Sequence, residues 1–200
     1  MTRCWLIRHG EPAPEARDRC YGSLDIELSP TGRAQMRQVA EDLGRERIAA
    51  IYASPRSRAL ESAEIIAAAA SCPLEIVTDL REIHFGDLEG LPFHEIALRY
   101  PELYALWMRS PSQVRFPNGE SFADLRHRVL RAFHIILQQH TNETICLISH
   151  GGVNRVLLAW TLEMPADYLF RLAQDYAAMN LLIVHREIPR VILMNRRPGK

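Results

Sequence analysis

Cys4-Trp5-Leu6-Ile7 is a short apolar run, and Arg8-His9-Gly10 follows it without a break. A run of this length, bounded by polar residues and glycine, is typical of a buried β-strand. In an open α/β sheet the carboxyl ends of the strands form the crevice that binds ligands. Arg8 and His9 would stand in that crevice, and Gly10 would let a ligand approach closely. The pattern predicts a site that handles an anion.

The same pattern occurs again near the end of the chain. Thr144-Ile145-Cys146-Leu147-Ile148-Ser149 is an apolar run, and His150-Gly151-Gly152 follows it. One such histidine is as often a buried structural residue as a functional one. Two histidines at two strand ends predict a shared site much more specifically.

A third segment, Ser54-Pro55-Arg56-Ser57-Arg58, follows the apolar residues Ile51-Tyr52-Ala53. Serine is a preferred N-cap and proline a preferred first helical residue, so a helix is expected to begin here. Arginines in a first turn oppose the helix macrodipole, which indicates that an anion shares this site. The alternative is that Arg58 pairs with Glu61 one turn further on.

The fourth segment is the carboxylate-rich loop Leu80-Arg81-Glu82-Ile83-His84-Phe85-Gly86-Asp87-Leu88-Glu89-Gly90, after the strand-like residues Leu74 to Thr78. In this order, and along nearly the whole chain, the four segments resemble the histidine phosphatase, or phosphoglycerate mutase-like, superfamily. Two further stretches, Cys20 to Ser29 and Asp175 to Asn180, look most like its α-ribazole phosphatase branch.

The resemblance implies roles for individual residues. The nucleophile of the family maps onto His9 and its proton donor onto Glu82. The phosphate pocket maps onto Arg8, Arg58 and His150. Further substrate contacts are expected at Glu15, Tyr21, Gly22, His84 and Gly151.

Position 15 departs from the family pattern. Many members carry Ser or Thr and then Asn after the Arg-His-Gly-Glu motif, where this chain has Pro12 and Glu15. An ionised glutamate offers no hydrogen-bond donor and repels a phosphate. We therefore expect Glu15 to turn away from the phosphate or to contact the rest of the substrate.

Transfer of a phosphoryl group needs a nucleophile, stabilisation of negative charge and a proton for the leaving alkoxide. His9 would attack through one ring nitrogen while the other donates to a backbone carbonyl near Gly10. Arg8 and Arg58 would hold phosphate oxygens bidentately. His150 is expected to be protonated beside the bound phosphate.

Glu82 would protonate the leaving group, so it must hold a proton at neutral pH. We expect partial burial beside Ile83 and Phe85, together with the charge of the phosphate, to favour that form. The alternative is a solvated loop carboxylate paired with Arg81. Glu11, Asp87 and Glu89 are weaker candidates for the acid.

No metal and no cofactor are expected. The chain has no Cys-x-x-Cys, His-x-x-x-His or Asp-x-Asp pattern, and Cys4, Cys20, Cys72 and Cys146 are scattered singly. The arginines already bring the positive charge that a metal ion would supply.

Composition limits the class of protein. The 200 residues are 48% apolar, which is enough for one domain spanning 1–200, and 24 basic residues balance 24 acidic ones. We therefore expect a small phosphorylated metabolite as ligand, and neither a nucleic acid nor a membrane surface. No apolar stretch is long enough to span a bilayer, so a cytoplasmic protein, a monomer or homodimer, is expected.

Helical patterns alternate with short apolar runs, which predicts an α/β fold: a three-layer α/β/α sandwich around a mostly parallel sheet. Helices are expected from Ser29-Pro30 to about Arg45, from Arg58 through 65–70, and from Gly152 through Trp160. The runs Leu181 to His185 and Val191 to Met194 predict a closing hairpin around Pro189. An apolar stripe on one helical face predicts core positions at Phe122, Leu125, Val129, Phe133 and Ile136.

A cap insertion at about 88–120 is expected over the C-terminal strand ends, because its aromatic residues lack the periodicity of a strand. In the superfamily this region shapes the substrate pocket, so the specificity candidates are Trp107, Arg109, Arg115 and Glu120. The alternative is that the aromatic residues only anchor the cap to the core.

The function that the sequence favours is a metal-independent phosphomonoesterase, with α-ribazole 5′-phosphate as the candidate substrate. A phosphoglycerate mutase-type phosphotransferase is the nearest alternative, although the insertion is short for that activity. The third hypothesis is that the protein is a catalytically silent relative that binds a phosphorylated ligand.

Overall fold

The computed structural model describes residues 1–186 and 188–199. Its centre is a sheet in which the strand order is β3-β2-β4-β1-β5-β6. In chain order the strands are β1 (Thr2–Arg8), β2 (Ile48–Ala53), β3 (Leu74–Ile76), β4 (Thr144–Ser149), β5 (Met179–His185) and β6 (Ile188–Arg196).

The sheet is mostly parallel, as predicted. β1 pairs in parallel with β4, and β2 pairs in parallel with both β3 and β4. β5 runs antiparallel to β1 and to β6, so the chain closes on the expected hairpin. Pro189 does not lie at the turn, because it is paired with Val184 inside β6. Residue 187, next to that turn, lies outside the described residues.

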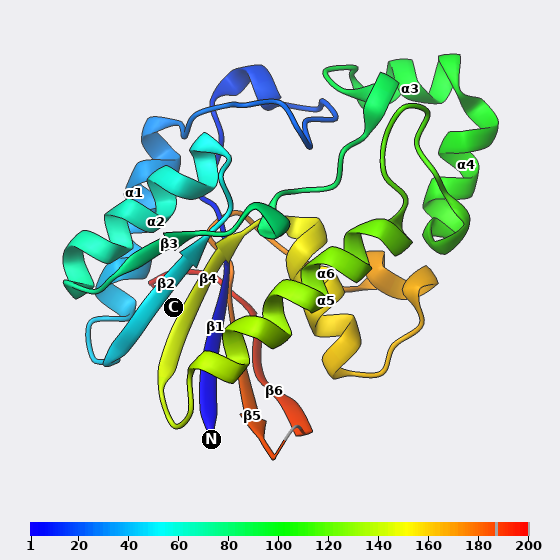
Figure 1. Cartoon of the computed structure of the whole chain (residues 1–200). Coiled ribbons are helices and arrows are strands. Elements are labelled where there is room, and N and C mark those ends of the chain that lie inside the picture. The colour runs from blue at the N-terminus through cyan, green and yellow to red at the C-terminus, as the bar shows by residue number, and fades with distance from the viewer. Residues whose placement is uncertain (187, 200) are drawn as a thin grey trace.

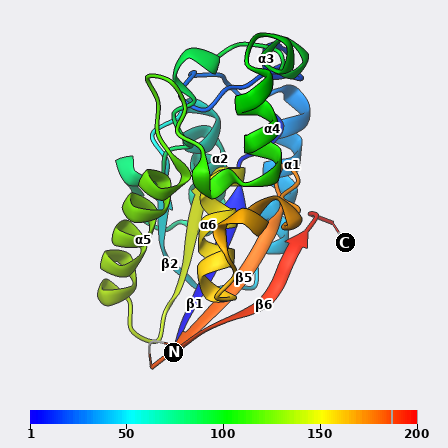
Figure 2. The same cartoon turned by 90° about the vertical axis from the view of Figure 1, so that its right-hand side faces the viewer.

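Helices cover both faces of the sheet (Figure 1 and Figure 2). α1 (Pro30–Asp42) and α2 (Ser57–Ala70) lie on one face, and α5 (Phe122–Gln139) and α6 (Gly151–Thr161) on the other. Alternate side chains of β1 enter the two cores: Trp5 and Ile7 pack with α1 and α2, and Cys4 and Leu6 pack with α5 and α6. This alternation produces the predicted three-layer sandwich.

The local signals of the helices are largely confirmed. The Ser29 hydroxyl accepts from the backbone N–H of Gly32 and caps α1, which ends at Asp42, before the expected Arg45. Ser121 and Asp124 form a capping box at the start of α5. The predicted apolar stripe of α5 is buried: Phe122, Leu125, Val129, Phe133 and Ile136.

The cap consists of α3 (Phe93–Arg99) and α4 (Pro101–Arg109), and it lies above the end of the sheet where β1 and β4 finish (Figure 1). Trp107 of α4 packs on Phe85 and Phe116, with ring centroids 5.3 and 5.0 Å apart. Short 3-10 helices complete the connections: η1 (Pro14–Ala16), η2 (Thr78–Leu80), η3 (Gly86–Leu88), η4 (Pro111–Gln113) and η5 (Ala166–Arg171). In the described part of the chain, none of the helices has both the length and the apolar character needed to cross a bilayer.

Gly10 has a different purpose from the predicted one. A Cβ at this position would lie 2.5 Å from the carbonyl oxygen of Gly32. The absent side chain therefore lets α1 pack against the end of β1, and the prediction that it clears a path for the ligand is wrong. This contact fixes the backbone next to His9.

Candidate active site

The neighbouring parallel strands β2, β4 and β1 end at the same edge of the sheet, and the residues that follow them lie there. Arg8 is in register with Ser149, and Ala53 with Ile148. The following backbone N–H groups continue the ladder: His9 donates to Ser149 (2.9 Å) and Ser54 donates to Ile148 (3.0 Å). His9, His150 and Ser54 therefore meet, and the two strand-end histidines do share one site.

His9 is buried, and its ring is fixed by one hydrogen bond. Nδ1 lies 2.7 Å from the carbonyl oxygen of Gly10, so Nδ1 carries the proton, as predicted. Nε2 is then left with its lone pair. Burial, together with the charges of Arg58 and Arg8, holds the pKa of His9 well below its usual range. At neutral pH this side chain is an uncharged imidazole with a free nucleophilic nitrogen.

His150 lies against His9, with ring centroids 5.2 Å apart. Its Nε2 forms a hydrogen bond of 2.7 Å with the hydroxyl of Ser54. Burial, followed by the charge of Arg58, by His9, which would repel a second proton if it were protonated, and by the charge of Arg8, lowers the pKa of His150 well below its usual range. The free site therefore contains two uncharged histidines.

Three buried polar atoms at this site have no partner. In the part of the chain that the structure describes, eight buried side-chain atoms lack a hydrogen-bond partner, and Nε of Arg8, Nε of Arg58 and Nδ1 of His150 are three of them. Nearly all buried polar groups in proteins are paired. The oxygens of a phosphate would supply the missing acceptors to all three residues that the sequence assigned to phosphate binding.

Backbone carbonyls hold Arg58, which is fully buried. Its Nη1 donates to Leu24 (2.7 Å), and its Nη2 donates to Gly22 (2.9 Å) and Tyr21 (3.1 Å). The free two-pronged fork that the sequence predicted is therefore not available. The alternative pairing with Glu61 is also wrong, because that carboxylate pairs with Arg33.

Arg8 is held more loosely than Arg58. Its Nη1 donates to the carbonyl oxygen of Gln174 (2.5 Å), and its guanidinium carbon lies 4.1 Å from the centre of the Tyr176 ring. The hydroxyl of Tyr176 is 2.7 Å from that of Tyr21. The two stretches that resemble the α-ribazole phosphatase branch therefore meet beside the site.

Ser54 does not cap α2, which was the expectation. The helix begins at Ser57. The carboxylate of Asp25 accepts hydrogen bonds from the Ser57 backbone N–H (2.7 Å) and from the Ser57 hydroxyl (2.8 Å). The Ser54 hydroxyl is engaged with His150 instead. Sequence reasoning found this residue but assigned it the wrong role.

Glu82 is fixed by two backbone donors. Its Oε1 accepts from Ile83 (3.0 Å) and its Oε2 accepts from Gly152 at the start of α6 (2.9 Å). A Cβ at Gly152 would lie 2.3 Å from Oε1, so any other residue here would displace the carboxylate from its present position. The alternative pairing with Arg81 is not formed, because Arg81 contacts Glu120 and Asp79.

A cavity of about 180 Å³ connects His9, the arginines and Glu82, whereas His150 and Ser54 are fully buried and do not line it. Of the predicted residues, it is lined by Arg8, His9, Tyr21, Arg58, Glu82, Trp107 and Gly151. Trp107 lines the cavity and also anchors the cap to the core. The two interpretations of the aromatic residues of the cap are therefore compatible at this position. Sequence reasoning missed the following lining residues: Arg19, Cys20, Phe93, Phe122, Gly152, Arg155 and Phe170.

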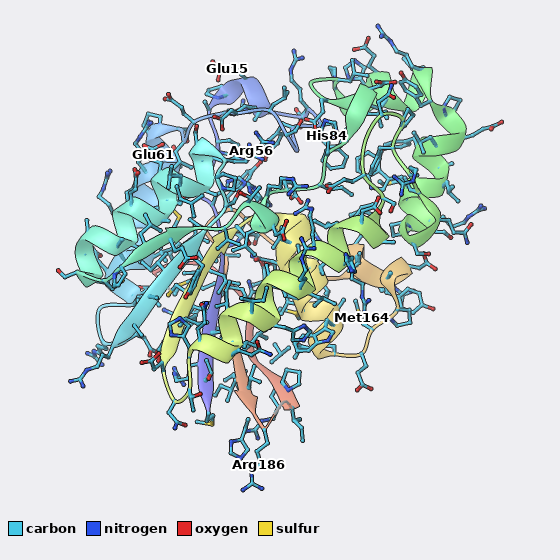
Figure 3. The ribbon with its side chains drawn as sticks, viewed as in Figure 1. Glu15, Arg56, Glu61, His84, Met164 and Arg186 are labelled. Atoms are coloured by element: carbon cyan, nitrogen blue, oxygen red, sulfur yellow. The ribbon has the colours of Figure 1, made fainter. Side chains whose placement is uncertain are left out.

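The other predicted substrate contacts lie outside the cavity. Glu15 is exposed on η1 at the outer edge of the molecule (Figure 3), in agreement with the expectation that it turns away from the phosphate. Gly22 lies where a Cβ would clash with Ile83, so it allows two loops to touch. The backbone N–H of His84 donates to Glu120 (3.0 Å). Arg109 and Arg115 are exposed.

Comparison with known proteins agrees with this geometry. The model of the histidine phosphatase superfamily (branch 1) matches residues 4–197. The metal-independent phosphoserine phosphatase of Arabidopsis thaliana is 38% identical over 78% of this chain and 67% of its own. Phosphoserine phosphatase 1 of Hydrogenobacter thermophilus is 30% identical over 97% of this chain and 91% of its own.

A solved structure also shows a closely similar fold. Bacillus stearothermophilus YhfR superposes with a TM-score of 0.92 and 31% identity, over 96% of each chain. The chain belongs to the histidine phosphatase superfamily and is a phosphatase of that type.

Proposed function

We propose that this phosphatase hydrolyses small phosphomonoesters through a phosphohistidine on His9, without a metal ion. The observation that carries the proposal is the geometry of His9, whose Nδ1 is held by the carbonyl oxygen of Gly10 so that Nε2 is free, in one site with three buried nitrogen atoms that lack hydrogen-bond partners. A neutral imidazole is the nucleophilic form, and the unpaired donors are already oriented for a phosphate.

The first half of the reaction forms a phosphorus–nitrogen bond. Nε2 of His9 attacks phosphorus while Arg8, Arg58 and His150 stabilise the charge on the equatorial oxygens. The bond to the alcohol oxygen breaks, and the Glu82 carboxyl gives its proton to that oxygen. Bound phosphate raises the pKa of His150, since a nearby anion favours the imidazolium.

The second half restores the enzyme. The Glu82 carboxylate takes a proton from a water molecule, which attacks phosphorus and breaks the phosphorus–nitrogen bond. Inorganic phosphate leaves, and His9 is again neutral. The arginine charges remain throughout, because a guanidinium keeps its proton at any physiological pH, and they supply the charge that a metal would otherwise bring.

Two alcohols are candidates for the leaving group. The stretches at 20–29 and 175–180 support α-ribazole 5′-phosphate, and the names of the relatives support phosphoserine. The proposal requires net hydrolysis, so incubation with 3-phosphoglycerate and its bisphosphate primer should release phosphate without efficient isomerisation.

The neutral state of both histidines can be tested by NMR. An unperturbed histidine titrates near pH ~6.5. In the free enzyme the ring Cε1–H signals of His9 and His150, assigned with single variants, should keep their neutral positions as the pH falls from 7.5 to below that value. Added phosphate should move the His150 signal toward that of an imidazolium. Free-enzyme titration of either ring near pH ~6.5 would contradict the assignment.

Replacing His9 by alanine should reduce kcat by at least ~10³-fold on every substrate while the melting temperature is retained, because the side chain supplies the nucleophile. Substrate labelled in its phosphoryl group should label wild-type protein under alkaline quench, but not this variant. EDTA should leave wild-type turnover unchanged. Substantial turnover by a folded His9→Ala protein would remove the basis of the proposal.

The leaving group distinguishes Glu82 from His9. A poor alkoxide needs a proton and p-nitrophenolate does not, so Glu82→Gln should lower kcat on an alkyl phosphate by ~10²-fold or more and largely spare p-nitrophenyl phosphate. Steady-state kinetics on both substrates provide the measurement. An equal loss on the two would show that another group protonates the leaving oxygen.

A further inference from the structure

We infer that the alcohol half of the substrate carries a carboxylate and that Arg155 binds it. The inference rests on the proposed function and specifies its substrate class as small phosphorylated acids. Arg155 lines the same cavity as His9 and Glu82 but is not among the residues to which we assign phosphate binding, Arg8, Arg58 and His150.

The first argument is the charge of the cavity. Four arginines line the cavity, of which Arg19 is exposed and Arg8, Arg58 and Arg155 are more enclosed, and the carboxyl group that lines it is that of Glu82, the acid of the proposed mechanism. A phosphate monoester brings a charge of about −2 at neutral pH. Three guanidinium groups, together with the His150 imidazolium that the bound phosphate favours, leave about two positive charges unneutralised, which a further anion on the substrate would reduce.

The second argument is how Arg155 is held. Its Nε donates to the carbonyl oxygen of Leu172 (2.9 Å), and its guanidinium carbon lies 5.8 Å from the centre of the Phe170 ring. Among residues 1–186 and 188–199, neither terminal nitrogen has a hydrogen-bond acceptor. These contacts fix the guanidinium and leave its outer edge for a planar, two-oxygen acceptor, which is the geometry of a carboxylate.

The third argument is the repulsion between neighbouring cations. A Cβ at Gly151 would lie 2.9 Å from Nη1 of Arg155 and 3.6 Å from the guanidinium carbon of Arg8, so both groups lie beside the start of α6. Burial and the charge of Arg8 lower the pKa of Arg155. An anion at this position would relieve the repulsion between the two guanidinium groups.

The size of the cavity favours a compact substrate. Its volume of about 180 Å³ is below the roughly 300–1,000 Å³ typical of pockets for drug-sized ligands. A phosphorylated hydroxy or amino acid is much smaller than a nucleotide. Charge and size therefore both favour phosphoserine-like substrates over α-ribazole 5′-phosphate.

Matched substrate pairs test the inference. Phosphoserine and phosphoethanolamine differ only by a carboxylate, as glycerate 3-phosphate and glycerol 3-phosphate differ by one carboxylate in place of a hydroxymethyl group. Wild-type kcat/KM should be ~10–100-fold higher for the acid of each pair, which is the scale of a hydrogen-bonded charge pair. α-Ribazole 5′-phosphate should resemble the neutral substrates, and fructose 1,6-bisphosphate should not be preferred to fructose 6-phosphate.

The Arg155→Gln variant should abolish that preference, mainly through a higher KM for the acids. Its kcat/KM for phosphoethanolamine and p-nitrophenyl phosphate should fall much less than that for the acids, because these substrates carry no carboxylate. Arg109→Gln is the matched control, because Arg109 is exposed on the cap and does not line the cavity. The melting temperature of each variant is measured alongside.

Several outcomes would overturn the inference. Wild-type enzyme that ignores the carboxylate, or that prefers α-ribazole 5′-phosphate or a bisphosphate, would overturn it even if Arg155→Gln fails to fold. A folded Arg155→Gln variant that loses equally on all substrates would assign Arg155 to the phosphate. Neither result affects the phosphohistidine, so failure of this inference is distinguishable from failure of the proposed function.

A second, independent observation concerns Arg128, a buried residue of α5. Its Nη1 donates to the carbonyl oxygens of Asp79 and Arg81 (both 2.7 Å), and its Nη2 donates to that of Glu82 (3.0 Å). Its Nε and Nη2 also donate to the two carboxylate oxygens of Glu120 (both 2.8 Å). The three carbonyl groups belong to the segment that carries the proposed acid.

Glu120 binds the same segment on the C-terminal side of Glu82. It accepts from the backbone N–H of His84 (3.0 Å) and from Arg81 (3.2 Å). Burial alone would raise the pKa of Glu120, but the hydrogen bonds from Arg128 and His84 hold it below its usual value. Glu120 is therefore an ionised partner of Arg128 and not the specificity residue that the sequence predicted.

We propose that Arg128 and Glu120 are positioning residues for Glu82. The pair fixes the backbone on both sides of Glu82, and misplacing a reacting group by 1 Å can cost ~10²-fold. Arg128→Lys and Glu120→Gln should each lower kcat on an alkyl phosphate by about 10-fold or more and largely spare p-nitrophenyl phosphate. Arg131→Lys is the matched control, because Arg131 contacts Asp79 from the exposed face of α5.

The double variants with Glu82→Gln complete this test. If Arg128 and Glu120 act through Glu82, their effects on the alkyl phosphate should disappear once the acid is gone. Equal losses on both substrates, or additive losses in the double variants, would show a purely structural role. Glu120→Gln retains the shape of the side chain, so it decides the question if Arg128→Lys does not fold.

Discussion

A buried imidazole between two guanidinium groups is the interaction on which this site depends. Arg58 and Arg8 repel a proton from His9, and burial removes the water that would stabilise the imidazolium. The same two cations are the groups that a phosphate would meet. The same two positive charges therefore keep His9, the proposed nucleophile, unprotonated and attract the phosphate to it.

Such a site is unfavourable to build, because Arg58 is fully buried and no carboxylate of the described residues forms an ion pair with it; Glu82 and Asp25 act on its charge only from further away. Three carbonyl oxygens of the Tyr21–Leu24 loop replace the missing counter-ion. A carboxylate there would neutralise the arginine and compete with the phosphate, whereas carbonyl dipoles solvate the charge without cancelling it. The loop is thus part of the electrostatic design, and Gly22 lets it lie against the backbone of Ile83.

The sequence predicts the elements that depend on local pattern. Apolar runs ending in histidine identify β1 and β4, and their parallel register brings His9 and His150 together. The roles of Ser54, Arg58 and Glu120 depend on partners far away in the chain, which neither spacing nor propensity reveals. One feature of the sequence could have identified Arg155. It lies one helical turn after Gly151, so it is on the face of α6 that begins at the site.

The structure separates the two tasks of the enzyme in space. Groups at the strand ends face the phosphoryl group, which is the same in every phosphomonoester. The first turns of α6 and the cap line the rest of the cavity, where we propose that the alcohol binds, and the alcohol differs between substrates. Because Arg155 and Trp107 can change without touching His9 or its hydrogen bond to Gly10, the substrate preference of such a site can change while the phosphoryl chemistry is kept. In the proposed mechanism Glu82 serves both tasks, since it would give its proton to the alcohol, and Arg128 and Glu120 bind the backbone on both sides of it.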